Sequence, residues 1–501
     1  MRPHITRIGD LMGFLHAVPG HHTPGASWLQ AAGIGITGIT ADSRAVAPGF
    51  LFAALPGTRH DGRAFIAEAV ARGAAAVLAP DGTTWPAGIP SRPLLTDPEP
   101  RRCLAQMAAA VEGPGPSTTV AVTGTNGKTS TVSFLRQIWR LSGEKSASLG
   151  TLGLEAENFP AGPGLTTPDP ISLARTLAAL ARQGIDHAAL EASSHGLDQF
   201  RLDGVSLVAA GFTNLTRDHL DYHGTEAAYR AAKLRLFAEL LPQGAPAIVN
   251  ADMDPATLAA LRSIAEARQL NLQTIGEAGT KIRLLSATPH PHSQTLKIQA
   301  NGVTRGIDLP LVGRFQADNA LLAAALADTT GTANALDRLA HLKGVRGRME
   351  LAATLPNGAA IYVDYAHTPD ALEGLLSALR PHTRGKLVVV FGAGGDRDRG
   401  KRPLMGAVAA RRAERAIVTD DNPRSEDPAA IRAAILAACP GAQNIGDRAS
   451  AIATGLTLLG PGDVLAIAGK GHEQGQTIGT TSLPFDDVAM VRRLTGQGTA
   501  P

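Results

Sequence analysis

The chain has 501 residues, of which 44% are hydrophobic and 18% are charged, and its 47 basic and 44 acidic side chains give a formal net charge of +3. This length suggests about three domains, and a near balance of charge without a Lys/Arg run argues against a nucleic-acid-binding surface. The two cysteines, Cys103 and Cys439, lie far apart, which argues against a disulfide framework and a structural zinc site. We see no secretory leader and no membrane-length apolar run, so we expect a soluble cytoplasmic protein.

Strands and helices alternate along most of the chain and are interrupted at two seams. A helix predicted for residues 101–111 ends at the Gly- and Pro-rich first seam, residues 112–117. The elements predicted after it are strand 118–123, helices 128–141 and 171–182, strands 188–192 and 207–213, helix 227–241, strand 247–250, and helices 315–328 and 333–342.

The second seam, residues 342–348, precedes predicted strands at residues 360–364, 386–391, 416–419 and 464–468. Near-continuous apolar strands that alternate with helices are typical of parallel sheets covered on both faces, so we predict an α/β fold in three pieces. Residues 276–308 show no feature that we can interpret.

The segment 120–130, Val-Ala-Val-Thr-Gly-Thr-Asn-Gly-Lys-Thr-Ser, combines a strand, a glycine turn and a helix start. Backbone N–H groups of such a loop can point at a phosphate, Lys128 can neutralise the phosphates, and the Thr129 hydroxyl can sit on Mg²⁺. The spacing is a shortened form of the Walker A pattern, and the simpler alternative is a glycine turn with a chance Lys-Thr. The residues expected to surround the nucleotide phosphates are Gly124, Thr125, Asn126, Gly127, Lys128, Thr129 and Ser130.

Two further residues are candidates for the chemistry. Glu191 ends a predicted strand, so its carboxylate can bind Mg²⁺ at the same sheet edge as the phosphate loop, although it can equally cap the strand end. Lys233 lies in an apolar helical stripe with Tyr229 and Phe237. An ammonium that reaches water beyond its stem is the simpler explanation, whereas a desolvated amine could react with carbon dioxide to form a carbamate.

The compact Gly-Thr-Asn-Gly-Lys-Thr loop and the Asn-Leu-Thr-Arg-Asp-His-Leu-Asp segment at 214–221 resemble the Mur ligase family. These enzymes are peptidoglycan-precursor synthetases related to folylpolyglutamate synthetase. The resemblance implies a smaller N-terminal α/β domain that binds UDP (residues 1–113), a central ATP-binding P-loop domain (114–344) and a C-terminal Rossmann-like domain that binds the amino acid (345–501). It also implies that Lys128, Glu191, His219 and a carbamylated Lys233 are catalytic, and that Thr129, Glu191, His219 and Lys233 hold Mg²⁺.

The resemblance assigns substrate contacts as well. It implies that Ser43, Thr58, Arg59 and His60 touch the UDP part, and that Thr166, Thr167, Ser193, Gln199 and Arg201 touch the muramoyl-dipeptide part. It also implies that the ATP nucleotide is contacted by Asn319, Arg348, Asp364 and His367. From the residues alone, ordinary turn capping explains most of these positions.

The loop at 421–424, Asp-Asn-Pro-Arg, is identical to the signature of the members that add meso-diaminopimelate. An Asp and an Arg in one tight loop can hold an ammonium and a carboxylate together, although a surface turn is equally compatible with the sequence. The resemblance implies that the amino acid is bound by Arg397, Asp421, Asn422, Pro423, Arg424, Gly469 and Glu473.

The activity implied by the resemblance is an ATP- and Mg²⁺-dependent ligation. It converts the D-glutamate carboxylate of UDP-N-acetylmuramoyl-L-alanyl-D-glutamate to an acyl phosphate, which meso-2,6-diaminopimelate then attacks. We expect a monomer with small-molecule substrates and no nucleic-acid or membrane partner. A folylpolyglutamate synthetase is the alternative enzyme, but the N-terminal segment and residues 421–424 argue against it. A nucleotide-gated binding module would leave Glu191, His219 and Lys233 without a role.

Overall fold

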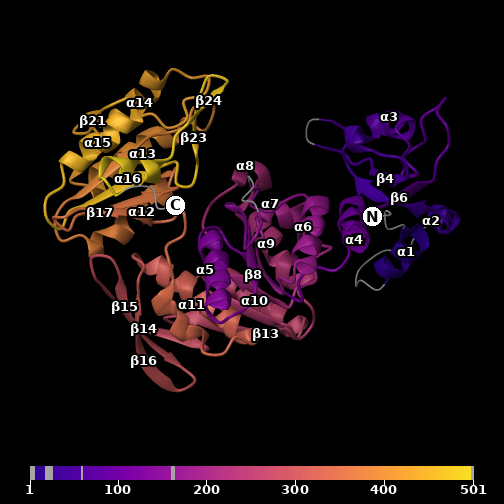
Figure 1. Ribbon diagram of the computed structural model, residues 1–501, viewed down its shortest axis with the longest axis horizontal. Coiled ribbons are helices and arrows are strands. Elements are labelled where there is room, and N and C mark those ends of the chain that lie inside the picture. Colours follow the sequence, from indigo (N-terminus) through magenta and orange to yellow (C-terminus); the bar gives the residue numbers. More distant parts are fainter. Residues whose placement is uncertain (1–5, 17–25, 58–59, 160–163, 498–501) are drawn as a thin grey trace. The chain divides into compact units, whose positions relative to one another are not determined.

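The computed structural model describes residues 6–16, 26–57, 60–159 and 164–497 (Figure 1). The chain divides into two compact units. The first contains the chain up to Lys128 together with Trp139–Gln273 and Leu326–Thr332, and the second contains Thr129–Ile138, Thr274–Ala325 and the chain from Ala333 onward. None of the described helices has the length and the apolar composition to cross a membrane.

The N-terminal part of the first unit is built on a parallel sheet in the order β3-β4-β5-β6. Its strands are β3 (Gly38–Thr40), β4 (Phe50–Ala53), β5 (Ala76–Pro80) and β6 (Leu94–Asp97). Two short antiparallel strands precede it, β1 (Thr6–Arg7) and β2 (Gly35–Ile36). The helices are α1 (Ile8–His16), α2 (Ala26–Ala31), α3 (Ile66–Ala71) and α4 (Pro100–Glu112), with 3₁₀ turns at Ser43–Ala45 and Gly62–Phe65.

Alternating side chains of this sheet enter two separate cores, as the period of two in a strand requires. Leu51 and Leu78 pack with α1, α2 and α4 on one face, whereas Phe52 and Val77 pack with α3 on the other (Figure 1). Ile171, from a helix of the next segment, completes the first of these cores. The N-terminal sheet therefore relies for part of its core on residues beyond position 113.

The strands of the central segment belong to a ten-stranded sheet in the order β16-β15-β14-β13-β12-β11-β7-β10-β8-β9. Those of the first unit are β7 (Thr118–Thr123), β8 (Ser146–Gly150), β9 (Gly153–Ala156), β10 (His187–Glu191), β11 (Ala209–Phe212), β12 (Pro246–Asn250) and the start of β13 (Asn271–Gly276). Strand β7 lies between β10 and β11 and is parallel to both. The carboxyl ends of these strands therefore meet at one edge.

The connecting helices are α5 (Lys128–Leu141), α6 (Pro170–Arg182), α7 (Ser194–Asp198), α8 (Leu220–His223), α9 (Glu226–Arg235) and α10 (Pro255–Ala267). The Asp169 side chain accepts the first N–H groups of α6, and Pro170 occupies its first turn, as in many helix starts. The helix predicted for 227–241 instead changes to a π-helical turn at Leu236–Leu240, where the Leu241 N–H donates to the Leu236 carbonyl.

The second unit contains an antiparallel meander of β14 (Ile282–Pro289), β15 (Gln294–Ala300) and β16 (Val303–Leu309). Helix α11 (Arg314–Thr329) follows, and the helix predicted for 333–342 is a 3₁₀ segment at Ala335–His341. A six-stranded sheet then contains β17 (Glu350–Thr354), β18 (Ala360–Asp364), β22 (Val464–Ala468), β19 (Leu387–Phe391), β20 (Arg415–Val418) and β21 (Gln443–Asn444), in that spatial order.

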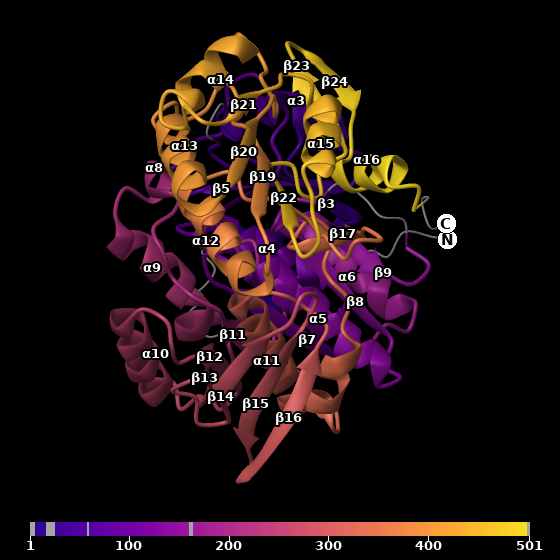
Figure 2. The same cartoon turned by 90° about the vertical axis from the view of Figure 1, so that its left-hand side faces the viewer.

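Helices cover both faces of this six-stranded sheet (Figure 2). One face carries α12 (Pro369–Leu379), α13 (Lys401–Arg412) and α14 (Pro428–Leu436), and the other carries α15 (Arg448–Thr457) and α16 (Asp487–Leu494). A 3₁₀ turn at Arg380–His382 follows α12, and β23 (Gly475–Ile478) with β24 (Thr481–Pro484) forms a hairpin after β22. The observed layers confirm the predicted α/β class.

Candidate active site

The loop after β7 is shaped for an anion. Val122 pairs with Glu191 across β7 and β10, so the loop and the Glu191 side chain leave the same edge of the sheet. Gly124 and Gly127 have backbone φ angles of 140° and 86°, which residues other than glycine rarely adopt. Helix α5 begins at Lys128, directly after the loop, so its N-terminal N–H groups face it. The Lys128 Nζ lies 2.8 Å from the carbonyl oxygens of both Gly124 and Thr125.

The loop is also fixed to the segment that follows β11. Thr125 N–H donates to the Asn214 carbonyl at 2.8 Å, and Asn126 N–H donates to Asn214 Oδ1 at 3.0 Å. The Thr213 hydroxyl donates to the Asn126 carbonyl at 2.6 Å, and Thr125 Oγ1 lies 3.0 Å from the Tyr229 hydroxyl of α9. These bonds hold the loop in position before any phosphate binds.

Lys233, on α9, lies beneath this loop and does not reach water. Only 1% of it is exposed, and its Nζ donates to the Gly124 carbonyl at 2.8 Å and lies 4.5 Å from the centre of the Tyr229 ring. Burial lowers the pKa of Lys233 well below its usual value, and Lys128 lowers it further, whereas Asp218 opposes the shift. The buried amine of Lys233 therefore loses its proton more readily than the amine of an exposed lysine.

Glu191 is a buried carboxylate held by neutral groups. It is 2% exposed, and Thr151 donates to it twice, from N–H to Oε1 at 2.8 Å and from the hydroxyl to Oε2 at 3.2 Å. The Thr151 hydroxyl also lies 3.0 Å from that of Thr166. A Cβ at Gly150 would lie 2.0 Å from Oε1, so glycine at that position makes room for the carboxylate. Both groups that donate to Glu191 are therefore neutral groups of Thr151.

His219 lies apart from this carboxylate contact. Its backbone is left-handed, with φ 51° and ψ 30°, and its Nε2 is 3.5 Å from Asp218 Oδ2. Its ring packs edge-on against His195, with centroids 4.9 Å apart. Within the described ranges, no three His, Cys, Asp or Glu side chains are arranged to hold a metal ion. The structure thus brings the amines of Lys128 and Lys233 to the Gly124 carbonyl. Among the described residues, it does not bring Glu191 and His219 together with a third His, Cys, Asp or Glu side chain as a metal site.

The residues expected on the muramoyl-dipeptide side form one hydrogen-bonded group. The Thr167 hydroxyl lies 2.8 Å from the Glu191 carbonyl and 3.0 Å from the Ser193 hydroxyl. Arg201 donates to the Thr167 carbonyl at 2.6 Å and to Gln199 Oε1 at 2.7 Å. Burial lowers the pKa of Arg201, with Asp169 opposing that shift. This group therefore connects the Glu191 strand end to a second polar site.

Gln199 and Arg201 also line a cavity of about 690 Å³ in the first unit. Its wall includes Asp42, which caps the 3₁₀ turn after β3, and Phe50 of β4, and the basic side chains Arg101 and Arg175 from α4 and α6. Its size and its basic residues suit an anionic ligand of the size of a nucleotide.

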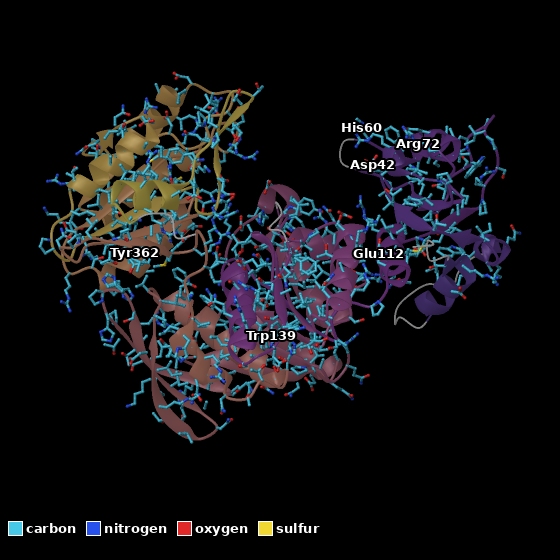
Figure 3. All side chains as sticks on the ribbon, viewed as in Figure 1. Asp42, His60, Arg72, Glu112, Trp139 and Tyr362 are labelled. Atoms are coloured by element: carbon cyan, nitrogen blue, oxygen red, sulfur yellow. The ribbon has the colours of Figure 1, made fainter. Side chains whose placement is uncertain are left out.

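The residues expected to touch UDP are only partly described. Ser43 is buried, and its hydroxyl donates to Glu68 Oε2 at 2.8 Å. His60 is exposed and stands near Phe65, with ring centroids 6.3 Å apart; Asp42 and His60 are both labelled in Figure 3. Thr58 and Arg59 lie outside the described residues.

In the second unit, a chain of side chains links α5 to Arg348. Thr131 donates to Asn319 Oδ1 at 3.5 Å, Asn319 Nδ2 donates to Gln316 Oε1 at 3.2 Å, and Gln316 Nε2 donates to the Arg348 carbonyl at 3.2 Å. The Arg348 guanidinium lies 4.7 Å from the centre of the Tyr365 ring. Two of the residues expected on the nucleotide side, Asn319 and Arg348, are thereby joined through Gln316.

Asp364 and His367 follow β18 in the same unit. The Asp364 carboxylate accepts the N–H groups of Met349 and Ala366, both at 2.8 Å. Burial raises the pKa of Asp364, and Arg348 opposes the shift. His367 Nδ1 lies 2.9 Å from the Tyr365 carbonyl, which orients its ring. Asp364 therefore fixes the backbone that carries Arg348.

The loop at 421–424 follows β20 and presents a buried acid. Asp421 is 7% exposed, and its Oδ2 is buried without a hydrogen-bond partner among the described residues. Arg424 has a φ of 51°, its N–H donates to Thr477 at 3.1 Å, and its guanidinium donates to Gly395 at 2.7 Å. Gly469 has a φ of 121°, and a Cβ there would lie 2.3 Å from Asp421 Oδ2. Arg397 is exposed.

Three supporting contacts of this site were not predicted from the sequence. Thr151 holds Glu191, Gln316 joins Asn319 to Arg348, and Tyr229 contacts the phosphate loop. Thr151 follows β8, so the sheet-edge argument applied to Glu191 also points to it. Tyr229 was recognised as part of the apolar stripe, but its hydroxyl contact with a residue far away in sequence has no local signal.

Three comparisons with known proteins agree with this arrangement. Profiles described as the Mur ligase family catalytic domain, the Mur ligase middle domain and the Mur ligase glutamate ligase domain match residues 35–110, 122–327 and 347–471. The chain is 55% identical over 462 residues to the UDP-N-acetylmuramoyl-L-alanyl-D-glutamate--2,6-diaminopimelate ligase of Caulobacter vibrioides, covering 91% of this chain and 94% of that one. It is 52% identical over 471 residues to the protein of that name from Rhizobium meliloti, covering 93% and 96%.

Solved structures show the same fold. A structure of a UDP-N-acetylmuramoyl-L-alanyl-D-glutamate--2,6-diaminopimelate ligase superposes with a TM-score of 0.72 at 32% identity and covers 99% of both chains. A Mycobacterium tuberculosis folylpolyglutamate synthase complexed with ADP and AMPPCP superposes with a TM-score of 0.62 at 19% identity, covering 79% of this chain and 95% of that one. At that identity the second likeness concerns the fold alone.

Proposed function

Because the chain belongs to the Mur ligase family, we propose that it is the ATP-dependent ligase that joins meso-2,6-diaminopimelate to UDP-N-acetylmuramoyl-L-alanyl-D-glutamate. The observation that carries the choice of amine is the loop of residues 421–424. It places the buried Oδ2 of Asp421, which has no hydrogen-bond partner in the part of the chain that the structure describes, on the same short loop as the guanidinium of Arg424. An acid and a guanidinium this close in sequence suit a substrate end that carries both an ammonium and a carboxylate.

The first step uses the loop after β7. Its backbone N–H groups and Lys128 hold the β- and γ-phosphates of ATP, and positioning with charge neutralisation supplies most of the catalysis in phosphoryl transfer. An oxygen of the D-glutamate side-chain carboxylate attacks the γ-phosphorus. The bond between that phosphorus and the β,γ-bridging oxygen breaks, so ADP leaves and an acyl phosphate remains.

The residues near this loop also fit Mg²⁺. Glu191 presents a buried carboxylate with neutral donors, and the desolvated Lys233 amine can add carbon dioxide to become an oxygen-donor carbamate. Carbamylation would also replace the repulsion between Lys233 and Lys128 with attraction. Thr129, Glu191, His219 and carbamylated Lys233 would hold the ion, which neutralises charge on the phosphoryl group when bound.

The second step takes place at the amino-acid loops. Asp421 accepts the ammonium at one end of the substrate, Arg424 and Arg397 pair with its carboxylate, and Glu473 contacts the same end. The distal amine, once deprotonated, attacks the acyl carbon. A C–N bond forms, the C–O bond to phosphate breaks, and the nitrogen loses its remaining extra proton to water.

Amine-dependent ADP release tests this proposal. Purified protein is given ATP, Mg²⁺ and UDP-N-acetylmuramoyl-L-alanyl-D-glutamate, with meso-diaminopimelate or L-lysine in parallel. We expect turnover with diaminopimelate to exceed that with L-lysine by about 100-fold or more, because lysine lacks the second carboxylate and leaves the site's guanidinium unpaired. Equal turnover with both amines would disprove the specificity, and ADP release that needs neither amine would disprove the ligation.

A further inference from the structure

Lys470 is a completely buried lysine whose ammonium is surrounded by acceptors. It follows β22, and its side chain has 0% exposure. Its Nζ donates to Asn422 Oδ1 at 3.0 Å and to the Gly475 carbonyl at 2.6 Å, and it lies 3.6 Å from Glu473 Oε2. Burying an ammonium is costly unless it is paired and hydrogen-bonded, so this arrangement is specific rather than incidental.

Asn422 is the centre of the group. Its Oδ1 accepts two hydrogen bonds, from Lys470 and from the Thr477 N–H at 2.9 Å, while its Nδ2 donates to Glu473 Oε2 at 2.9 Å. Two donors at one side-chain atom identify that atom as the oxygen, so the amide has a single orientation. The side-chain oxygen of Asn422 is thus committed to protein partners, and its nitrogen faces Glu473.

The group joins segments that are far apart in sequence. The loop of residues 421–424 follows β20, and Gly469–Glu473 follows β22, with β19 paired between these two strands. The third segment is β23, which supplies the Gly475 carbonyl and the Thr477 N–H, and whose Gln476 donates to the Asp421 carbonyl at 2.8 Å. The two loops that would bind the amino acid are therefore fastened to each other mainly by Lys470 and Asn422.

We propose that Lys470 is a positioning residue of the amino-acid pocket, which holds the Asn422 amide and balances the Glu473 carboxylate so that Glu473 meets the amine substrate in one fixed orientation. This inference rests on the proposed function. Asn422 is then also a positioning residue, because its side-chain amide forms hydrogen bonds with Lys470, Thr477 and Glu473. Specificity for the diamino acid then depends on a buried cation that does not itself touch the substrate.

Loss of this ammonium should affect one substrate selectively. In Lys470→Met, Asn422 Oδ1 loses one of its two donors and Glu473 loses its neighbouring cation, so the carboxylate no longer has a defined place. We expect KM for diaminopimelate to rise about 10- to 100-fold, the range for losing a hydrogen bond to a charged group. The kcat should fall less, and KM for ATP and for the UDP-linked substrate should stay within about twofold.

The test is steady-state kinetics of the full chain with each substrate varied in turn, together with thermal unfolding. Lys297→Met, at an exposed position of β15, is the matched control and should change none of these constants. Asn422→Asp is a second variant of nearly unchanged shape. It puts a carboxylate against Glu473 in place of the Nδ2 donor, and it should raise the same KM.

A double-mutant cycle of Lys470→Met with Glu473→Gln separates positioning from general stability. If Lys470 acts through Glu473, the double variant should be barely worse than Glu473→Gln alone. An unchanged KM for diaminopimelate in a folded Lys470→Met protein, or an equal rise of all three KM values, would overturn the inference. Either result leaves the proposed function intact if the unmodified protein still needs diaminopimelate for ADP release, whereas loss of that need would overturn the proposed function itself.

Discussion

At the scale of single residues, Lys233 illustrates how burial prepares a side chain for chemistry. Its amine shares the Gly124 carbonyl with Lys128, and burial lowers its pKa. An ammonium in such a place is unfavourable next to a second cation, whereas a carbamate would be attracted by it. The sequence placed Lys233 in an apolar stripe but left open whether its end reached water; the structure settles that it does not.

We predict that Lys233→Ala nearly abolishes ATP-dependent ligation, by about 100-fold or more, because the variant removes a carbamate ligand of the phosphoryl-transfer site. Acetate or another short-chain carboxylate should partly restore turnover by occupying the vacated space. The measurement is ADP release with and without the added acid, with Lys297→Ala as an exposed control. Normal turnover of Lys233→Ala would exclude the carbamate role.

His472 makes stability depend on pH. Burial and the nearby Arg348 and Arg346 lower the pKa of His472 to about 4, whereas the unfolded chain should titrate near 6.5. Between these values the unfolded state binds the proton and the folded state does not, so the free energy of unfolding falls as the pH drops from about 6.5 to 4. The contribution of the neutral His472 ring to the free energy of unfolding is therefore fully present above about pH 6.5, and it decreases as the pH falls toward 4.

His472→Gln should remove that acid sensitivity. We expect the loss in unfolding free energy between pH 7 and pH 5 to be about 1–2 kcal/mol smaller in the variant, after allowing for the partial exposure of the ring. Urea unfolding at the two pH values measures the difference. Parallel pH dependence of the two proteins would show that His472 is not the titrating group.

At the scale of elements, the meander β14–β16 was the main omission from the sequence interpretation. Its buried positions do alternate, with Leu296 and Ile298 on β15 and Ile307 and Leu309 on β16. Such alternation is typical of a half-buried strand, but the signal is weak because each of the three strands carries only two large buried apolar residues, and because β14 ends at a proline. Antiparallel strands without intervening helices also depart from the alternation that led to the parallel-sheet prediction.

The turn between β14 and β15 is bonded to His382, in the 3₁₀ turn after α12, and to Tyr362 of β18, whose hydroxyl donates to the Pro291 carbonyl at 3.3 Å. His382 Nε2 accepts the Gly313 N–H at 2.9 Å, and its Nδ1 lies 2.6 Å from the His290 carbonyl. The ring therefore carries its proton on Nδ1 and is neutral, in line with the lowering of its pKa by burial. Such a contact depends on residues 69 and 92 positions apart and cannot be predicted from local sequence.

Substituting His382 with alanine should destabilise the fold by about 2–4 kcal/mol, because the Gly313 N–H and the His290 carbonyl both lose a buried partner. Differential scanning calorimetry would detect the lower unfolding temperature. Arg384→Ala, only two positions away, serves as the control. If His382→Ala unfolded at the same temperature as the parent, this contact would not stabilise the two segments.

The hydrogen bonds that join the two amino-acid loops could not be predicted from the sequence either. Sequence motifs pointed to residues 421–424 and to Gly469–Glu473 as separate loops, in family order. The bonds between them join Asn422 to Lys470 and to Glu473, which lie 48 and 51 positions further along the chain. Residue types and strand ends were predictable, whereas the pairing of buried polar groups required the folded chain.

At the scale of the whole molecule, the fold class and the phosphate loop followed from the pattern of apolar strands and helices. The proposed boundaries at residues 113 and 344 stay predictions. Helix α6 contributes Ile171 and Ala174 to the core of the N-terminal sheet, and α4 packs against α6. A cut after residue 113 would thus expose apolar surface, so the N-terminal sheet and α6 are best studied together.

The central claim is that ATP activates a carboxylate as an acyl phosphate, and oxygen transfer tests it most directly. The D-glutamate side-chain carboxylate of the UDP-linked substrate is labelled with ¹⁸O, and the phosphate released during ligation to diaminopimelate is analysed by mass spectrometry. We predict one ¹⁸O atom in each released phosphate, because the C–O bond of the acyl phosphate breaks when the amine attacks. Unlabelled phosphate, produced alongside the ligated product, would contradict the account.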